Sequence, residues 1–228
     1  MQKDIKEMQA SGIRTNPSAP RVSADIIATL RDIPVALLSD NMQRNRGSVG
    51  LQPYHRPAPL AGTAVTVLTR GGDNLAILRA FEFCRPGDVM VVDAGADVTN
   101  AVIGGILSFY GASIGLAGMV IDGAIRDVAE IRERAFPVYA RGVNHRGPYK
   151  DGPGAINVPV TVGGMVVQPG DLVVGDQDGL VAFAPDMAAS LIEKAATQRA
   201  KEEATMQAMR EGRWDRSFID ALEARCAN

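Results

Sequence analysis

The chain has 228 residues, of which 46% are hydrophobic, and a formal net charge of -2 at pH 7. A chain of this length and composition can bury a full core, so global disorder is not expected. Its isoelectric point near 5.7 argues against a nucleic-acid partner, because nucleic-acid binding needs a basic face. Two cysteines, Cys84 and Cys226, form neither a disulfide framework nor a metal-site spacing, which favours a cytoplasmic protein with free thiols.

Two segments bear on targeting and membranes. The polar residues 1–20 contain no apolar stretch of the kind found in signal peptides, and we predict a loosely held arm there. Residues 101–121 carry no charge and are long enough to cross a bilayer. They also hold five glycines and lie between Asp97 and Asp122 rather than beside Lys or Arg. We therefore predict a buried helix, turn and strand, and no membrane partner.

The first half of the remaining chain alternates between helical and strand patterns. Residues 23–33 have apolar residues at helical spacing behind a serine that could cap the helix, and Pro34 begins a second short helix. The β-branched residues 60–69 predict a strand. Residues 73–83 predict a helix capped by their first residue, and a Pro-Gly turn then leads into a strand over residues 88–95.

The middle of the chain continues this alternation. A helix is expected to begin at Gly104 and Gly105, followed by a strand over residues 117–122, a helix over residues 127–136 and a strand over residues 137–142. Strands separated by helices in this way are typical of a parallel sheet.

The last part of the chain is different. A loop rich in Gly, Pro and charge spans residues 141–154, residues 155–184 form several short β-runs, and residues 186–210 form a charged helix before a short final helix. The whole pattern predicts an α/β fold that combines a mixed sheet with a barrel-like portion. No G-x-G-x-x-G sequence follows an apolar strand, so a nicotinamide-binding domain is a poor fit.

Candidate chemistry begins with Arg126 and Asp127, which follow an apolar strand, where open α/β sheets usually bind ligands. Asp127 could cap the next helix, with Glu130 completing a capping box, or it could bind a metal. Arg126 taken alone would be an ordinary surface cation. The spacing of these residues leaves both interpretations open.

The second candidate is the helix start at Gly104 and Gly105. Two glycines leave the backbone N–H groups unobstructed, and the helix dipole favours an anion at this end. The alternative is a glycine turn that only fits a tight corner. Together with Arg126 and Asp127, the helix start would suit a keto acid: the N–H groups hold its carboxylate and a hard ion such as Mg²⁺ on Asp127 chelates carboxylate and carbonyl.

The stretch DGAIRDVAEIRERAFPVYARGVNHRGPYK, followed by INVPVTVGGMVVQPGDLVVGDQDGLV, resembles the RraA-like family over most of residues 55–185. Within that family the chain most resembles the divalent-metal-dependent 4-hydroxy-4-methyl-2-oxoglutarate aldolases, which use Mg²⁺ or Mn²⁺ and release pyruvate. The resemblance implies a swivelling β/β/α fold over residues 21–185, after an arm of residues 1–20 and before a C-terminal helical extension of residues 186–228. It also implies homotrimeric or homohexameric rings with sites at subunit interfaces.

The resemblance assigns roles to particular residues. Arg126 would bind substrate and assist catalysis, Asp127 would bind the metal, and the backbone from Gly104 through Gly105 and Ile106 to Leu107 would hold the pyruvate carboxylate.

Two further features follow from the aldolase subgroup. A glutamate on the C-terminal helix of a neighbouring subunit supports the metal through water, and Glu202 is the candidate here, although solvated helix charge is an open alternative. The aldolases also carry an acidic residue at the position of Gly105. That carboxylate positions or activates the water that handles the alcohol proton, so Gly105 puts proton transfer in doubt.

Other reactive side chains provide weaker candidates. Of five lysines only Lys150 lies in the central body, in a polar loop, which disfavours a Schiff-base aldolase. His55 and His145 have no partner at metal-ligand spacing. His145, Arg146 and Lys150 could help to hold a second substrate carboxylate, or could form a solvated loop.

Three functions remain in competition. The leading one is a metal-dependent pyruvate aldolase with oxaloacetate decarboxylation as a side activity. The second is a related enzyme on another hydroxy or keto acid, with Gly105 marking changed chemistry. The third is a non-catalytic ring protein like the ribonuclease-regulating members of the family, which resemble only the core and lack the terminal extensions.

Overall fold

The computed structural model describes residues 12–44, 47–219 and 222–223. Its strands are β1 (Ile13–Thr15), β2 (Gln52–Pro53), β3 (Leu60–Thr69), β4 (Asp88–Asp93), β5 (Ala101–Ile103), β6 (Gly118–Ile125), β7 (Val138–Val143), β8 (Gly154–Ile156), β9 (Val160–Val162), β10 (Met165–Val167), β11 (Leu172–Gly175) and β12 (Leu180–Phe183). Its helices are α2 (Ala24–Arg31), α3 (Val35–Asp40), α4 (Leu75–Ala80), α5 (Gly105–Ser113), α6 (Val128–Arg132) and α7 (Ala188–Arg210), with short 3₁₀ turns η1 (Phe81–Phe83) and η2 (Pro185–Met187).

A parallel group of strands forms the centre of the molecule. The main sheet has the order β1-β8-β3-β4-β6-β7-β2, and β3, β4, β6 and β7 run parallel to one another. β6 is buried along its whole length, as are nearly all residues of β3, which explains their continuous apolar sequences. β5 adds a short parallel strand beside the end of β6.

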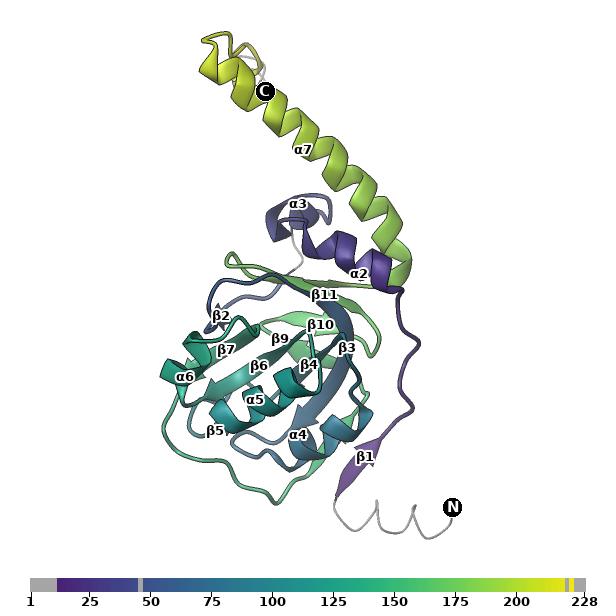
Figure 1. The fold of residues 1–228 in the computed structure, drawn as a ribbon, viewed down its shortest axis with the longest axis vertical. Helices are drawn as coiled ribbons and strands as arrows, with labels where there is room; N and C mark the ends of the chain where they lie inside the picture. The colour runs from purple at the N-terminus through teal and green to yellow at the C-terminus, as the bar shows by residue number, and fades with distance from the viewer. Residues whose placement is uncertain (1–11, 45–46, 220–221, 224–228) are drawn as a thin grey trace.

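The two faces of this sheet have separate cores, because alternate side chains of a strand point to opposite faces. On one face, Met90 and Ile121 pack in a cluster with Ile77 of α4 and Ile131 of α6. Figure 1 shows α4, α5 and α6 together in front of the strands. On the other face, Val91 joins a cluster that includes residues of the β9–β10 hairpin.

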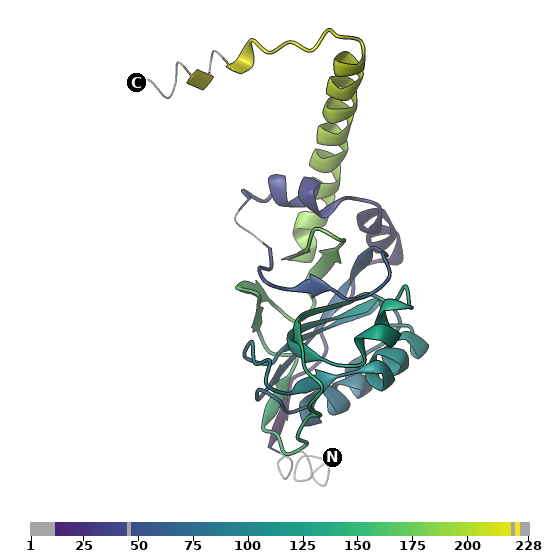
Figure 2. The ribbon, with the colours of Figure 1, turned by 90° about the vertical axis from the view of Figure 1, so that its left-hand side faces the viewer.

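A third core attaches the terminal helices. β11 pairs antiparallel with both β3 and β12, and residues of α2, α3 and α7 pack against β11 and β12. α7 runs for 23 residues, and its second half extends away from the body (Figures 1 and 2). The mixed sheet and the long C-terminal helix confirm the α/β fold expected from the sequence, and no helix in the described residues could cross a membrane.

Several local expectations were wrong. The predicted helix over residues 127–136 ends at Arg132. The uncharged residues 101–121 do form the predicted helix, turn and strand, as α5 and the first part of β6, but β5 precedes them and was not predicted. β1 and β5 were missed because three-residue strands carry too little pattern to recognise. Ser23 precedes α2 but its side chain makes no capping hydrogen bond.

The described part of the N-terminal arm is not loose, contrary to expectation. β1 pairs in parallel with β8, and the side chains of Asn16 and Asn157 each donate to the other's backbone carbonyl, at 3.0 and 3.1 Å. Ile13 is buried against the main core. The boundary at residue 20 stays a prediction, and residues 1–11 lie outside the described part.

Candidate functional site

The two candidate segments are brought together by β5 and β6. These strands are parallel, with Ile103 opposite Ile125, so their carboxyl ends lie at the same edge of the sheet. The chain continues from β5 into Gly104 and from β6 into Arg126, whose backbone N–H donates to the carbonyl of Ile103 at 3.0 Å. The glycine pair and the Arg-Asp pair, far apart in the sequence, are therefore neighbours.

Asp127 contacts the start of α5 directly. Its Oδ2 accepts a hydrogen bond from the backbone N–H of Gly105 at 3.0 Å and lies 3.7 Å from Nε of Arg126. Its backbone has φ of 57°, in the left-handed region that Asp tolerates better than most residues. A non-glycine residue held in this conformation is common at functional sites.

The structure excludes the predicted capping box. Asp127 precedes α6, but its side chain makes no capping hydrogen bond to that helix. Glu130 instead pairs with Arg134, one turn further along. The carboxylate of Asp127 is turned toward α5 because the left-handed backbone directs it away from the first turn of α6. Asp127 therefore does not cap α6, which was the structural role that the sequence had left open for it.

Gly104 is required by this arrangement. A Cβ at this position would lie 2.5 Å from Oδ2 of Asp127 and 2.8 Å from Cγ of Arg126. Any larger residue would displace the two side chains to which the sequence assigns chemistry. This close approach favours a functional glycine over one that only makes a turn.

A pocket of about 190 Å³ opens at this edge of the sheet. All of the expected substrate-binding residues except Gly105 line it. The full lining is Asn74, Leu78, Val102, Ile103, Gly104, Ile106, Leu107, Arg126, Asp127, Pro148 and Lys150. The first turn of a helix leaves backbone N–H groups without intrahelical acceptors, and at α5 these belong to the residues that follow Gly104. The pocket thus combines anion-binding N–H groups, a guanidinium and a carboxylate.

Asn74 is a pocket residue that the sequence analysis missed. It is only 4% exposed, and its Nδ2 donates to the carbonyl of Val102 at 3.1 Å, which orients the amide. Its Oδ1 is one of two buried side-chain polar atoms in the described residues that have no hydrogen-bond partner. A buried acceptor of this kind needs an explanation, and a ligand hydroxyl or water in the pocket provides one. The sequence did offer a signal for Asn74, because it is a polar residue directly after Asp73, the predicted cap of the helix.

Asp73 holds the loop that carries Lys150 to the pocket. This fully buried carboxylate accepts backbone N–H groups from Leu75, Asp151 and Gly152 at 2.7 to 3.1 Å, so it binds both the first N–H of α4, whose N-cap residue is Asn74, and the backbone of the loop. Burial opposes ionisation, but these hydrogen bonds outweigh it and lower the pKa of Asp73. Lys150 lines the pocket, whereas His145 and Arg146 do not.

The other acids near the site in sequence are engaged elsewhere. Asp122 is buried, pairs with Arg141 and accepts the N–H of Gly163 at 2.7 Å. Asp97 accepts the N–H and hydroxyl of Thr99. Neither lines the pocket.

A hard divalent ion fits the donors present better than zinc does. No group of three or more His, Cys, Asp or Glu side chains gathers at metal-binding distance in the described residues. Asp127 presents one carboxylate, and Mg²⁺ is commonly held by one or two carboxylates together with waters and substrate oxygens. This donor set is compatible with an ion that a keto acid helps to chelate.

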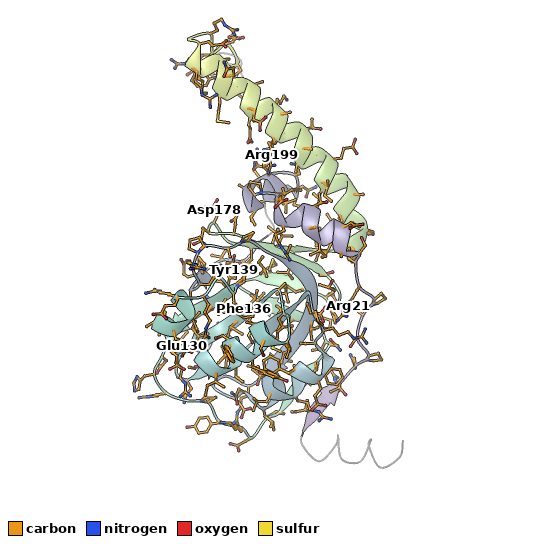
Figure 3. All side chains as sticks on the ribbon, viewed as in Figure 1. Arg21, Glu130, Phe136, Tyr139, Asp178 and Arg199 are labelled. Carbon is orange, nitrogen blue, oxygen red and sulfur yellow. The ribbon has the colours of Figure 1, made fainter. Side chains whose placement is uncertain are left out.

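Glu202 is not brought to this site within one chain. It lies on α7, where its carboxylate accepts Nε2 of Gln198 at 2.9 Å, and α7 packs on α2 and α3. Figure 3 shows Arg199, one turn before Glu202, on α7 and far from Glu130, which lies three residues after Asp127. Glu202 was expected to support the metal from a neighbouring subunit, and that role stays a prediction.

Comparisons with known proteins found a matching family model and several relatives. The family model described as RraA-like, Aldolase/RraA, matches residues 35–182. A protein of Halalkalibacterium halodurans, provisionally named 4-hydroxy-4-methyl-2-oxoglutarate aldolase, is 37% identical over 81% of this chain and 89% of its own length.

Two solved structures share the fold. Streptomyces coelicolor RraAS2, described as an unusual member of the RNase ES inhibitor RraA family, has a TM-score of 0.76 at 28% identity, covering 82% of this chain and 98% of its own. The RNA-processing inhibitor RraA from Thermus thermophilis has a TM-score of 0.61 at 29% identity, covering 67% and 93%.

Replacing Asp73 by Asn should loosen the loop at the pocket and destabilise the protein by about 1–3 kcal/mol at pH 7, because buried N–H donors lose a charged acceptor. The folded pKa of Asp73 is lowered, so its contribution is present above the unfolded value, near 3.8, and is lost as pH falls through the folded value. Urea unfolding should therefore show a difference between the two proteins that shrinks below about pH 4. A difference independent of pH would contradict this role.

Proposed function

Because the chain belongs to the RraA-like family, Aldolase/RraA, we propose that it is a divalent-metal-dependent lyase that cleaves 4-hydroxy-4-methyl-2-oxoglutarate, or a related 4-hydroxy-2-oxo acid, to pyruvate. The observation that carries this proposal is the carboxylate of Asp127 on the first N–H of α5, in one pocket with Arg126. This arrangement suits a substrate that presents a carboxylate beside a carbonyl.

Each group has a role that follows from its chemistry. The N–H groups of Ile106 and Leu107 bind the substrate carboxylate at the positive end of the helix dipole. The guanidinium of Arg126 stabilises the negative charge that develops on the carbonyl oxygen as the carbon–carbon bond breaks. Asp127 would hold Mg²⁺ or Mn²⁺, and the ion, when bound, supplies Lewis-acid polarisation of that carbonyl.

The same residues support oxaloacetate decarboxylation as a side activity. Both substrates carry a 2-oxo acid group, and loss of either CO₂ or a keto acid from C3 leaves the enolate of pyruvate. Charge therefore develops on the same oxygen, and Arg126 stabilises it in both reactions.

The far end of the substrate meets a different part of the pocket. Lys150 is exposed at the pocket, so its ammonium suits attraction of a second carboxylate. Asn74 presents Oδ1 to a hydroxyl donor. Cys84 is not a nucleophile here, because burial raises the pKa of its thiol to about 12.

We also propose that copies of this chain form a trimeric or hexameric ring. Ile106 at the pocket is 79% exposed, and Phe109 on the same helix is 59% exposed. The second half of α7 carries the exposed Met206 and Met209 and extends beyond the body, although an isolated helical segment has little stability of its own. A neighbouring subunit would cover these surfaces and could bring Glu202 to Asp127.

The central test is pyruvate release from 4-hydroxy-4-methyl-2-oxoglutarate and from oxaloacetate, with Mg²⁺ or Mn²⁺ and again with a chelator. We expect chelator-sensitive release from both substrates. Asp127→Ala should lower both rates at least about 100-fold, since it removes the protein's metal ligand. The matched control is Asp151→Ala on the nearby loop, whose exposed side chain lies outside the pocket lining. Absence of release from both substrates by the parent protein would overturn the proposed lyase function.

Asn74→Leu tests recognition of the hydroxyl. We expect kcat/KM for the hydroxy acid to fall about 10- to 100-fold, because a hydrogen bond to the substrate is lost, whereas oxaloacetate, which has no 4-hydroxyl, should lose less than about threefold. Steady-state kinetics with both substrates provide the measurement. Equal losses for both substrates would show that Asn74 only supports the fold.

Light scattering tests the assembly. We expect a mass of three or six times the 24.1 kDa of one chain. Phe109→Glu should lower that mass, because a charge placed in an apolar interface opposes association. The exposed Glu193→Gln on α7 is the control. A parent protein that runs as a single chain would contradict the ring.

A further inference from the structure

The side chain of Arg126 lies between two glycines. On one side, a Cβ built on Gly104 would lie 2.8 Å from Cγ and 3.3 Å from Nε of Arg126. On the other side, a Cβ built on Gly147, in the loop that follows β7, would lie 3.0 Å from Nη1 of the same guanidinium. Arg126 therefore occupies a slot that two glycines, from separate parts of the chain, leave open.

Gly147 is needed for Arg126 rather than for its own backbone. Its φ is not positive, so the backbone at this position would accept a residue with a side chain. In the described part of the chain, the non-neighbouring atoms within 4 Å of a Cβ on Gly147 are Nη1 and Cζ of Arg126, at 3.0 and 3.9 Å. The space that this glycine leaves free is thus occupied by one functional group, the guanidinium.

The loop that carries Gly147 is fixed to the beginning of β5. Nδ2 of Asn100 donates to the carbonyl of Gly147 at 2.7 Å. The backbone N–H of Ala101, the first residue of β5, donates to the carbonyl of Arg146 at 2.9 Å. Because β5 leads directly into Gly104, the two sides of the slot are held by the same short strand.

Arg126 has no protein hydrogen bond that would fix its guanidinium. In the described part of the chain the guanidinium donates to no acceptor, and the carboxylate within ion-pair distance, that of Asp127, lies 3.7 Å from Nε. A long side chain that is 41% exposed and unbonded would populate several rotamers. The slot restricts these rotamers while it leaves the N–H groups of Arg126 available to a substrate oxygen.

We propose that Gly147 and Asn100 are positioning residues for Arg126, a role that rests on the proposed function. Gly147 leaves the guanidinium room to lie beside the C2 oxygen on which the enolate charge develops, and Asn100 fixes Gly147 through its carbonyl. A charge that is placed in advance acts most strongly on the enolate, because the negative charge on that oxygen is greatest there. The effect of both residues should therefore require Arg126.

Steady-state kinetics provide the first arm. Gly147→Ala should lower kcat about tenfold for both substrates and Gly147→Val about 100-fold, because a displacement of the guanidinium by about 1 Å has an effect of this order. KM should change less than about threefold, because the charge develops in the transition state. Asn100→Ala should show the same pattern with a smaller loss. His145→Ala, on the same loop but outside the pocket lining, should change neither constant.

Binding of oxalate provides a second arm that needs no turnover. Oxalate is a planar dianion that resembles the enolate of pyruvate, whereas pyruvate itself presents a neutral carbonyl. In calorimetric titrations with Mn²⁺ present, Gly147→Ala should weaken oxalate binding about tenfold and pyruvate binding less than about threefold. When Gly147→Ala is added to Arg126→Ala, oxalate affinity should change less than about twofold, because the side chain that Gly147 positions is already absent.

The outcomes distinguish the failures. An equal loss of oxalate affinity with and without Arg126 would overturn the positioning role and assign Gly147 to the fold alone. Unchanged kcat in Gly147→Val, beside an active parent, would overturn the role but leave the lyase function intact. A parent that binds oxalate without turnover removes the proposed reaction, and the oxalate titrations still test the slot. A parent that neither binds oxalate nor turns over removes both.

Discussion

The site depends on the parallel pairing of β5 with β6. This short pairing sets the ends of two strands side by side, so that the helix start after one and the Arg-Asp pair after the other share a hydrogen bond between Gly105 and Asp127. The rest of the sheet supports this edge, since β4 and β7 pair with the two edges of β6 and separate cores bury its two faces. Without that rigid support, an acid in a left-handed conformation would relax toward the ordinary cap of α6.

Glycine and charge have complementary uses at this edge. Gly104 lets Asp127 and Arg126 approach the backbone, and Gly105 leaves room for Glu130. Arg126 and Arg134 each lie beside one of the two carboxylates and limit their mutual repulsion.

The loop across the pocket is positioned by a separate buried acid. Asp73 begins the turn into α4 and also holds the backbone of residues 151 and 152, so one carboxylate joins the helix and the loop into one wall of the pocket. Asn74 and Lys150 line the pocket from this wall, and in the proposed function Asn74 accepts a hydrogen bond from the substrate while Lys150 attracts its second carboxylate. The proposed function thus assigns substrate recognition to the Asn74 and Lys150 side of the pocket and the reaction to the Asp127 side.

The sequence by itself determined the long strands β3, β4, β6 and β7, the helix start at Gly104 and the position of Arg126 and Asp127 at the end of a strand, because periodicity and strand-end position are local properties. It could not decide whether Asp127 caps α6, since capping depends on a backbone angle that neighbouring strands impose. It also gave no signal that Glu130 lies against Gly105 or that Gly147 lies against Arg126. Those contacts join residues distant in the chain, and only tertiary packing brings them together.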